Sequence, residues 1–237
     1  ALLEGMLKVI VENPAKKLSP KWKTAVQSVL DVYLGKNPIE FTFEGKTYTP
    51  ASFLAFTKIN PDSYVSLTSF TNQPFYKSFI INIPDNFSNG SFYNLPLEEF
   101  IQNIDNALDK GFTLSLDCDV SEPYFSGKYG IAAVPANEAD NKTILTEIKP
   151  EKTITPEYRQ QEFENLTTQD DHLMHIVGKV KDQKGNFYYK VKNSWGTENM
   201  GNEGFIYMSV AYVKLKAISV LVHKEALLTN TKKMLSL

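Results

Sequence analysis

The sequence predicts an α+β fold, in which a mixed and more helical N-terminal half precedes a C-terminal third made of antiparallel strands. Three observations predict this class. Apolar residues recur at helical spacing in several segments before residue 111, and they alternate with polar residues in several short runs after it. Two of the later runs are joined by a short polar connection typical of a hairpin. A chain of 237 residues with 42% hydrophobic composition can also bury a substantial core.

The first 57 residues are predicted to form two helices, a hairpin and a third helix. Helical spacing extends over residues 2–10 and stops before an Asn-Pro pair. A Ser-Pro pair opens the second helix, which covers residues 19–35 and ends at a glycine. Residues 41–48 alternate apolar and polar side chains around a Glu-Gly turn, the pattern of a short hairpin. A Thr-Pro pair then begins the third helix at residue 49.

The central part of the chain is predicted to be mixed. Residues 64–92 are rich in aromatic, β-branched, Pro and Asn residues, which indicates short strands and ordered loops. Residues 97–111 have the spacing of a helix, and residues 112–120 alternate as a strand. Residues 135–170 are polar and are expected to form a long surface excursion, with partial helix over 156–165.

The C-terminal third is predicted to be an antiparallel β unit. Two apolar runs, 173–180 and 187–193, are joined by a polar segment that contains Gly and Asn, which favours a hairpin. Residues 204–208 and 218–222 add further strands.

The charge balance argues against nucleic acid and membranes as partners. The chain has 25 Lys+Arg against 27 Asp+Glu, so no cationic excess is available to hold a phosphate backbone or an anionic lipid surface. No run of about 18 apolar residues occurs, and the N-terminus lacks the layout of a signal peptide. We expect no nucleic-acid partner and no membrane span.

Two polar side chains meet at the open end of the predicted hairpin. We take Val180 to face Phe187 across the turn. Pairing then places Asn193 opposite Met174, within about two residues, some 7 Å, of His172. A histidine oriented by an amide oxygen is the base-and-orienter pair that nucleophilic catalysis requires. Because the amide is neutral, it suits a thiolate-imidazolium ion pair.

The residues around this pair resemble the histidine and asparagine motifs of the papain family. Asp171 to Met174 surrounds the histidine, and Lys192 to Gly196 contains the Asn-Ser-Trp-Gly run in which the family's asparagine sits. The resemblance implies a papain-like cysteine peptidase. It gives His172 the role of general base and acid, Asn193 the role of orienter, and Trp195 that of the indole which shields their hydrogen bond. It implies no cofactor and no metal.

Within that family the chain resembles the bleomycin hydrolase or aminopeptidase C branch, especially bacterial members. The supporting stretches are 64–70, 118–128 and 185–196. The branch implies aminopeptidase activity on peptide substrates, a possible homo-hexamer and, by family default, a cytoplasmic location unless a preceding segment holds a signal peptide. It also implies that residues 1–110 form a helical and mixed insertion region. Residues 111–237 would form an antiparallel β-barrel lobe carrying His172 and Asn193.

The nucleophile of such a peptidase is expected on another segment. Family members place a Gln-x-x-x-x-x-Cys-Trp motif well upstream, and these 237 residues contain no such segment. The single cysteine, Cys118, is flanked by Asp117 and Asp119, whose charges would raise a thiol pKa. It shares the apolar face of its strand, so we interpret it as a core residue. The chain is therefore expected to be a heavy chain or C-terminal fragment that needs a Cys-bearing light chain or N-terminal segment.

Other interpretations remain open from the sequence. The chain could be a catalytically silent papain-fold binding or scaffold protein that has lost the nucleophile. A zinc site at His172 and His175 is disfavoured, because residues three apart on a strand point to opposite faces. A serine hydrolase is disfavoured because no Gly-x-Ser-x-Gly elbow is present. His223 has no partner visible in the sequence.

Overall fold

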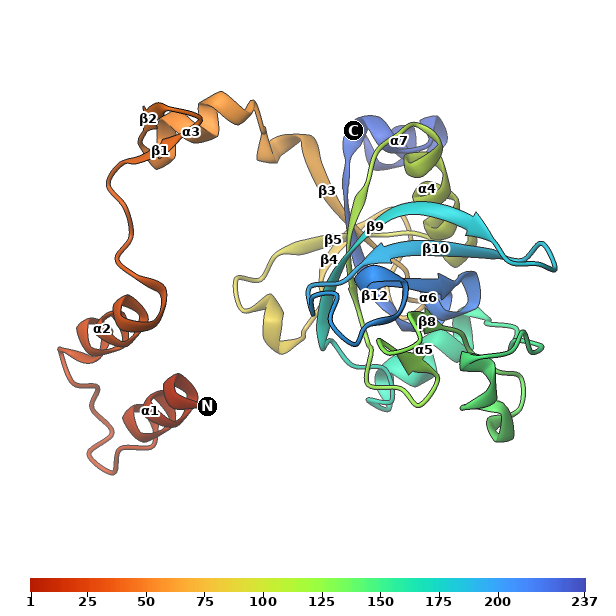
Figure 1. The fold of residues 1–237 in the computed structure, drawn as a ribbon, viewed down its shortest axis with the longest axis horizontal. Coiled ribbons are helices and arrows are strands. Elements are labelled where there is room, and N and C mark those ends of the chain that lie inside the picture. The colour runs from red at the N-terminus through yellow and green to blue at the C-terminus, as the bar shows by residue number, and fades with distance from the viewer. The chain divides into compact units, whose positions relative to one another are not determined.

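The computed structural model describes all residues, Ala1–Leu237, and it contains two compact units, Ala1–Asn60 and Pro61–Leu237. The first unit contains α1 (Leu2–Val11), α2 (Trp22–Leu34), β1 (Phe41–Phe43), β2 (Lys46–Tyr48) and α3 (Pro50–Thr57) (Figure 1). These elements confirm the predicted order. Thr49 begins α3 through a capping box with Ser52. Helix α2 begins after Lys21, slightly later than the Ser-Pro pair predicted, and ends at Gly35.

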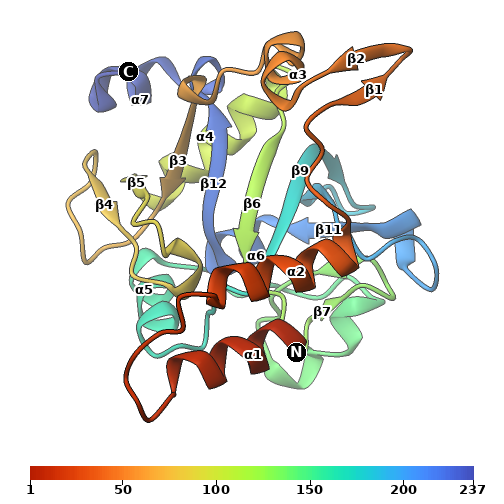
Figure 2. The same ribbon diagram turned by 90° about the vertical axis from the view of Figure 1, so that its left-hand side faces the viewer.

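The second unit is built on a mixed sheet of ten strands. The strands are β3 (Tyr64–Thr68), β4 (Ser78–Ile80), β5 (Ser91–Asn94), β6 (Leu114–Cys118), β7 (Phe125–Ser126), β8 (Ile131–Ala132), β9 (His172–Lys181), β10 (Phe187–Lys192), β11 (Phe205–Ser209) and β12 (Ala217–His223). Its helices are α4 (Leu97–Asp109), α5 (Pro156–Glu164), α6 (Val210–Lys216) and α7 (Thr229–Leu235). The spatial order is β4-β5-β3-β12-β6-β9-β10-β11-β8-β7, and Figure 2 shows β3, β12, β6 and β9 side by side.

The sheet is open, which differs from the predicted closed barrel. Strands β4 and β7 lie at opposite edges of the ladder and do not pair with each other. Two strand pairs, β3 with β5 and β8 with β11, are parallel. Alternation of apolar residues shows which strands have a buried face, but it does not determine whether the two edge strands meet. The α+β class itself is confirmed.

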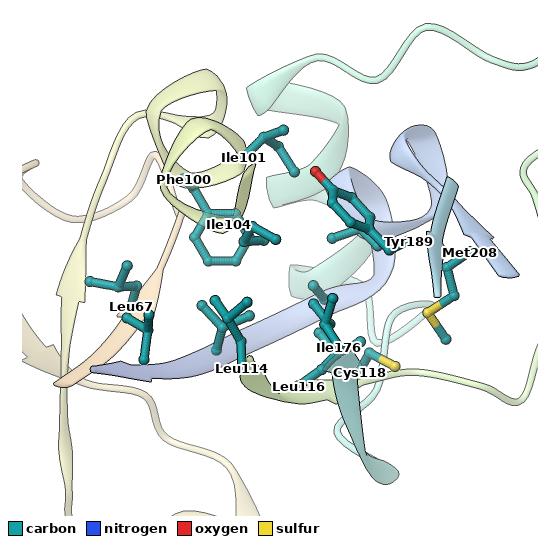
Figure 3. Packing of buried hydrophobic residues seen from close by; sticks show 14 of the residues in the cluster. Leu67, Phe100, Ile101, Ile104, Leu114, Leu116, Cys118, Ile176, Tyr189 and Met208 are labelled. Carbon is teal, nitrogen blue, oxygen red and sulfur yellow. The ribbon is translucent and has the colours of Figure 1, made fainter. Parts of the chain in front are cut away.

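The largest core cluster lies between the sheet and α4. In β6, Leu114, Leu116 and Cys118 are buried while the residues between them are partly exposed. In Figure 3, Leu114 lies beneath Phe100 and Ile104 of α4, and Leu116 and Cys118 continue the same apolar cluster beside Ile176. Full burial of each such side chain stabilises the fold by roughly 1.5–3 kcal/mol. This packing fixes β6, and through it the neighbouring strand β9 that carries His172.

The segment expected to form a surface excursion is anchored more deeply than its polar composition indicates. Arg159 of α5 is only 2% exposed. Its guanidinium donates hydrogen bonds to the backbone carbonyls of Ser69 and Lys214, which lie far away in the sequence. A buried arginine that donates to carbonyl groups distant in the sequence has no local sequence signature, which explains the difference.

The division of the chain into units falls between Asn60 and Pro61. The boundary predicted from the sequence lies at residue 110. Residues 64–94, which lie between those two points, contribute β3, β4 and β5 to the same sheet as β6 to β12. None of the helices is both long and apolar enough to span a bilayer.

Candidate active site

The hairpin of β9 and β10 brings the predicted histidine and asparagine together. Lys192 pairs with His175, so the next residue, Asn193, continues in register with Met174. This is the predicted relationship. The Nε2 atom of His172 lies 2.8 Å from the Oδ1 atom of Asn193.

At its turn, the hairpin has a different register from the predicted one, in which Val180 faces Phe187. Phe187 pairs with Lys181 rather than with Val180. The register then shifts between Lys190 and Val191. This bulge cancels the difference, because one extra residue on β9 restores the pairing at the open end.

The hydrogen bonds of Asn193 determine the tautomer of His172. The backbone N–H of Ser194 can only donate, and it lies 2.7 Å from Asn193 Oδ1. That contact identifies this atom as the amide oxygen, an acceptor. His172 Nε2 must then carry the proton that it shares with Asn193. In the neutral ring the Nδ1 atom keeps a free lone pair and can accept a proton.

Aromatic residues cover one side of the pair. The ring centroid of Trp195 lies 4.9 Å from that of His172, and Phe125 contacts Trp195 edge-on at 6.0 Å. Trp195 is still 45% exposed, so it screens the hydrogen bond from water on one side only. Screening of this kind strengthens a hydrogen bond by lowering the local dielectric.

Glycines allow the loop after Asn193 to fold back beneath it. Gly204 has a φ of +82°, and a Cβ atom there would lie 2.5 Å from the backbone oxygen of Gly196. The carbonyl of Gly204 accepts the backbone N–H of Asn193 at 3.3 Å. Gly127 gives room to Trp195 in the same way, since a Cβ atom would approach its indole to 3.1 Å. Gly196, the glycine of the Asn-Ser-Trp-Gly run, has no heavy atom near its Cβ position, but its φ of +81° is one that favours glycine.

The segment that leads into His172 is held by side-chain contacts to the end of β6. Asp171 accepts hydrogen bonds from the backbone N–H of Val120 at 2.9 Å and from the hydroxyl of Ser121 at 2.5 Å. The backbone N–H of Gln169 donates to Asp119 at 2.9 Å. Asp171 therefore holds the backbone, as expected of a loop carboxylate.

Cys118 lies opposite His172 in the β6–β9 ladder but is buried in the core. It is 1% exposed. Burial, followed by the charges of Asp117, Asp171 and Asp119, raises the pKa of its thiol well above the usual value. A thiol with a raised pKa is a poor source of thiolate. The geometry agrees with the core role inferred from the sequence.

The other two histidines have local partners elsewhere. His175 Nε2 lies 2.8 Å from the hydroxyl of Thr113. His223 stacks on Phe112 with a centroid distance of 5.2 Å, and its Nδ1 atom accepts the backbone N–H of Glu225 at 3.2 Å. The sequence did not reveal these partners of His223. Phe112 lies just before β6, and Glu225 belongs to the 3₁₀ turn that follows His223.

The fold and this pair define a papain-like architecture, and comparison with known proteins gives the family. The chain belongs to the Peptidase C1-like family, whose model matches residues 16–236. It is 29% identical over 202 residues to aminopeptidase G of Lactobacillus delbrueckii subsp. lactis. The alignment covers 81% of this chain and 42% of that protein. These matches confirm the predicted resemblance to a bacterial papain-like branch.

The crystal structure of PepW from Lactobacillus rhamnosis has the same fold. It superimposes with a TM-score of 0.67 at 19% identity and covers 98% of this chain and 55% of PepW. The chain thus spans about half the length of each of these two relatives.

Proposed function

We propose that this chain supplies the catalytic histidine and asparagine of a papain-like cysteine peptidase. The observation that carries the proposal is the 2.8 Å hydrogen bond between His172 Nε2 and Asn193 Oδ1. It leaves His172 Nδ1 as a free base held in one orientation, which is the requirement for activating a thiol. Membership of the Peptidase C1-like family supports the same chemistry.

In the proposed reaction His172 moves one proton in each half of the cycle. Its Nδ1 atom takes the proton of a cysteine thiol, and the thiolate attacks the carbonyl carbon of a peptide bond. The C–N bond breaks as His172 donates that proton to the leaving amine, which leaves an acyl-thioenzyme. His172 then deprotonates a water molecule that hydrolyses the thioester and regenerates the thiol. Asn193 holds the ring throughout, and Trp195 screens their hydrogen bond.

We further propose that the thiol comes from a light chain or N-terminal segment outside these 237 residues. Cys118 is the only cysteine of the chain, and it is buried with a raised pKa. The chain would then act as a heavy chain or C-terminal portion. The relative named aminopeptidase G supports an aminopeptidase as the whole protein. Assembly into a homo-hexamer stays a prediction.

A thiol-reactive peptide inhibitor tests the proposal. The native protein is purified without denaturation, treated with the inhibitor and analysed by mass spectrometry. We expect a labelled cysteine other than Cys118, and we expect His172→Ala to abolish labelling. His175→Ala is the matched control, because it removes the same side chain from the same strand without touching Asn193. Labelling should survive in that variant and in Cys118→Ala.

A catalytically silent binding or scaffold protein is the second candidate, and the burial of the only cysteine favours it. It predicts that no cysteine of the native preparation is labelled and that His172→Ala leaves the biological role unchanged. If no co-purifying segment with a labelled cysteine is found, the proposal that the purified protein is a cysteine peptidase is wrong.

A further inference from the structure

A cavity of about 370 Å³ lies beside the start of β9, and its charged lining is entirely acidic. Asp117 lines it from β6, Asp170 from the segment before His172, and Asp85 from the 3₁₀ helix η2 (Pro84–Asn86). The other lining side chains are apolar or carry a neutral amide. No lysine, arginine or histidine lines the cavity to neutralise the three carboxyl groups.

Asp117 and Asp170 are direct neighbours within this cavity. Both side chains line the cavity, and the proximity of Asp170 raises the pKa of Asp117. Asp117 Oδ1 and Asp170 Oδ2 are both buried, and neither meets an N–H or O–H group of the protein. Carboxylate oxygens only accept, so a hydrogen bond between two carboxyl groups requires a proton on one of them. One proton shared between the two carboxyl groups would satisfy both oxygens.

The surroundings of the pair favour keeping that proton. The pKa of Asp117 is raised to about 8, mainly by burial. The close approach of the Asp170 carboxyl group and then the charges of Asp170 and Asp85 also contribute to this rise in pKa. The hydroxyl of Ser219 on β12, 3.5 Å from Asp117 Oδ2, acts weakly in the other direction. Two carboxylates side by side cannot easily ionise together, as in other carboxyl dyads.

The pair occupies the middle of three consecutive contacts that hold the segment leading into His172. Gln169 is held by Asp119, and Asp171 by the residues that follow β6. Asp170 lines the same cavity as Asp117, and the ladder partner of Asp117 is Leu173, the residue after His172. Of the three contacts, this is the one that depends on a shared proton.

We propose that Asp117 and Asp170 are positioning residues, whose shared proton holds the start of β9 so that His172 meets Asn193. Loss of the proton leaves two facing carboxylates, with the carboxylate of Asp85 close by. Their repulsion pushes the segment before His172 away from β6. The consequence for activity rests on the proposed function, whereas the shared proton and the movement of His172 concern this chain alone.

NMR titration of the native protein, purified without denaturation and with any accompanying segment retained, tests the proposal. With ¹³C-labelled aspartate, we expect one carboxyl group to keep its proton to near pH 8. With ¹⁵N-labelled histidine, we expect the His172 ring signals to show an inflection at the same midpoint. His175 lies on the same strand and bonds to Thr113, so its ring is an internal control that should lack this inflection.

Two variants separate positioning from a merely structural role. Asp117→Asn replaces the shared proton by a permanent amide donor, so the His172 inflection should disappear while its hydrogen bond to Asn193 persists at alkaline pH. If that variant does not fold, Asp170→Asn supplies the reciprocal donor. Asp85→Asn is the control, since it removes only a neighbouring charge. It should lower the midpoint and keep the inflection.

The proposal is overturned if both carboxyl groups titrate in the ordinary aspartate range, or if the His172 signals do not follow the pair. The two NMR titrations do not depend on peptide hydrolysis. A failed inhibitor-labelling experiment with an intact shared titration would therefore remove the proposed function alone. In the assembled enzyme, Asp117→Asn should extend activity to higher pH, and an unchanged alkaline limb would count against the proposal.

Discussion

His172 and Asn193 come from opposite strands of one hairpin, and the Nε2 atom of the first donates a hydrogen bond to the Oδ1 atom of the second across 2.8 Å. Because the same oxygen also accepts the backbone N–H of Ser194, Asn193 is anchored to its own loop while it orients the imidazole ring. The orientation of the base is thus fixed by a β-hairpin register and by one side-chain amide.

Replacing Asn193 with Ala should lower kcat of the assembled peptidase by about 10²-fold to 10⁴-fold, the usual worth of a positioned acid-base group. The ring would lose both its orientation and its tautomer preference. The control is Ser194→Ala, which leaves the backbone N–H that contacts Asn193 in place. Steady-state kinetics of both variants with one peptide substrate checks this. An Asn193→Ala enzyme as fast as Ser194→Ala would contradict the orienting role.

Trp195 should contribute less than Asn193, because it screens the His172 hydrogen bond from one side only. We expect Trp195→Ala to lower kcat by roughly fivefold, equivalent to about 1 kcal/mol. Trp195→Phe keeps an aromatic ring at the same place and should lose less. Kinetics at two ionic strengths would separate screening from a change in substrate binding. Equal losses in the two variants would argue against the aromatic cover.

Gly204→Ala should destabilise the protein and the active-site loop together. The backbone there has a φ of +82°, and the new Cβ atom would lie 2.5 Å from the carbonyl oxygen of Gly196. Strain of this kind costs on the order of 1–3 kcal/mol. Gly178→Ala on β9 is the matched control, since a Cβ atom there would have no heavy atom within 4 Å.

Thermal unfolding of the two glycine variants measures the difference. The melting temperature should fall clearly for Gly204→Ala and stay near that of the original protein for Gly178→Ala. A similar fall in both would indicate that the fold tolerates an added methyl group poorly in general, and the close approach at Gly204 would then lose its special role.

Cys118→Ala should leave peptidase activity essentially unchanged. The thiol is buried in the core and its pKa is raised, so it cannot compete as the nucleophile. Cys118→Ser should destabilise the fold more, because a buried hydroxyl without a partner costs about 1–3 kcal/mol. Activity and chemical denaturation of both variants give the two readings. Loss of activity in a folded Cys118→Ala protein would reopen the question of the nucleophile.

The elements predicted from the sequence are those whose signals are local. The Thr-Pro pair before α3 places a cap and a first-turn proline within two residues, and the Glu-Gly pair fixes the turn between β1 and β2. Helix α6 was missed, because it is short and ends in Lys216. That lysine is fully buried, where it forms ion pairs with Asp119 and Glu122. Partners so distant in the chain leave no periodic pattern.

The candidate site was predictable to a similar degree. The Asn-Ser-Trp-Gly run and the hairpin pattern identify His172 and Asn193, because both depend on a few neighbouring residues. The bulge in β9 was not predictable, although it decides the register at the open end. The Asp117–Asp170 pair was missed for another reason, since only the β6–β9 ladder brings two separate acidic residues to one cavity.

The raised pKa of Asp117 should make folding stability depend on pH. In the unfolded chain this carboxyl loses its proton near pH 4, whereas in the folded protein it keeps it to about 8. Between these values the folded state binds one more proton, so stability contributed by the pair is present at low pH and falls as pH rises. The slope is at most about 1.4 kcal/mol for each pH unit.

Chemical denaturation between pH 5 and about 8 measures this slope, and Asp117→Asn should flatten it because the amide does not titrate in that range. Glu225, which pairs with Lys232 on the surface, offers a contrast. Its pKa is lowered by that lysine, so its contribution is lost as pH falls toward the acid range. Glu225→Gln should therefore leave the slope above pH 5 unchanged. If Asp117→Asn also leaves it unchanged, the proton is not held by this pair in the folded state.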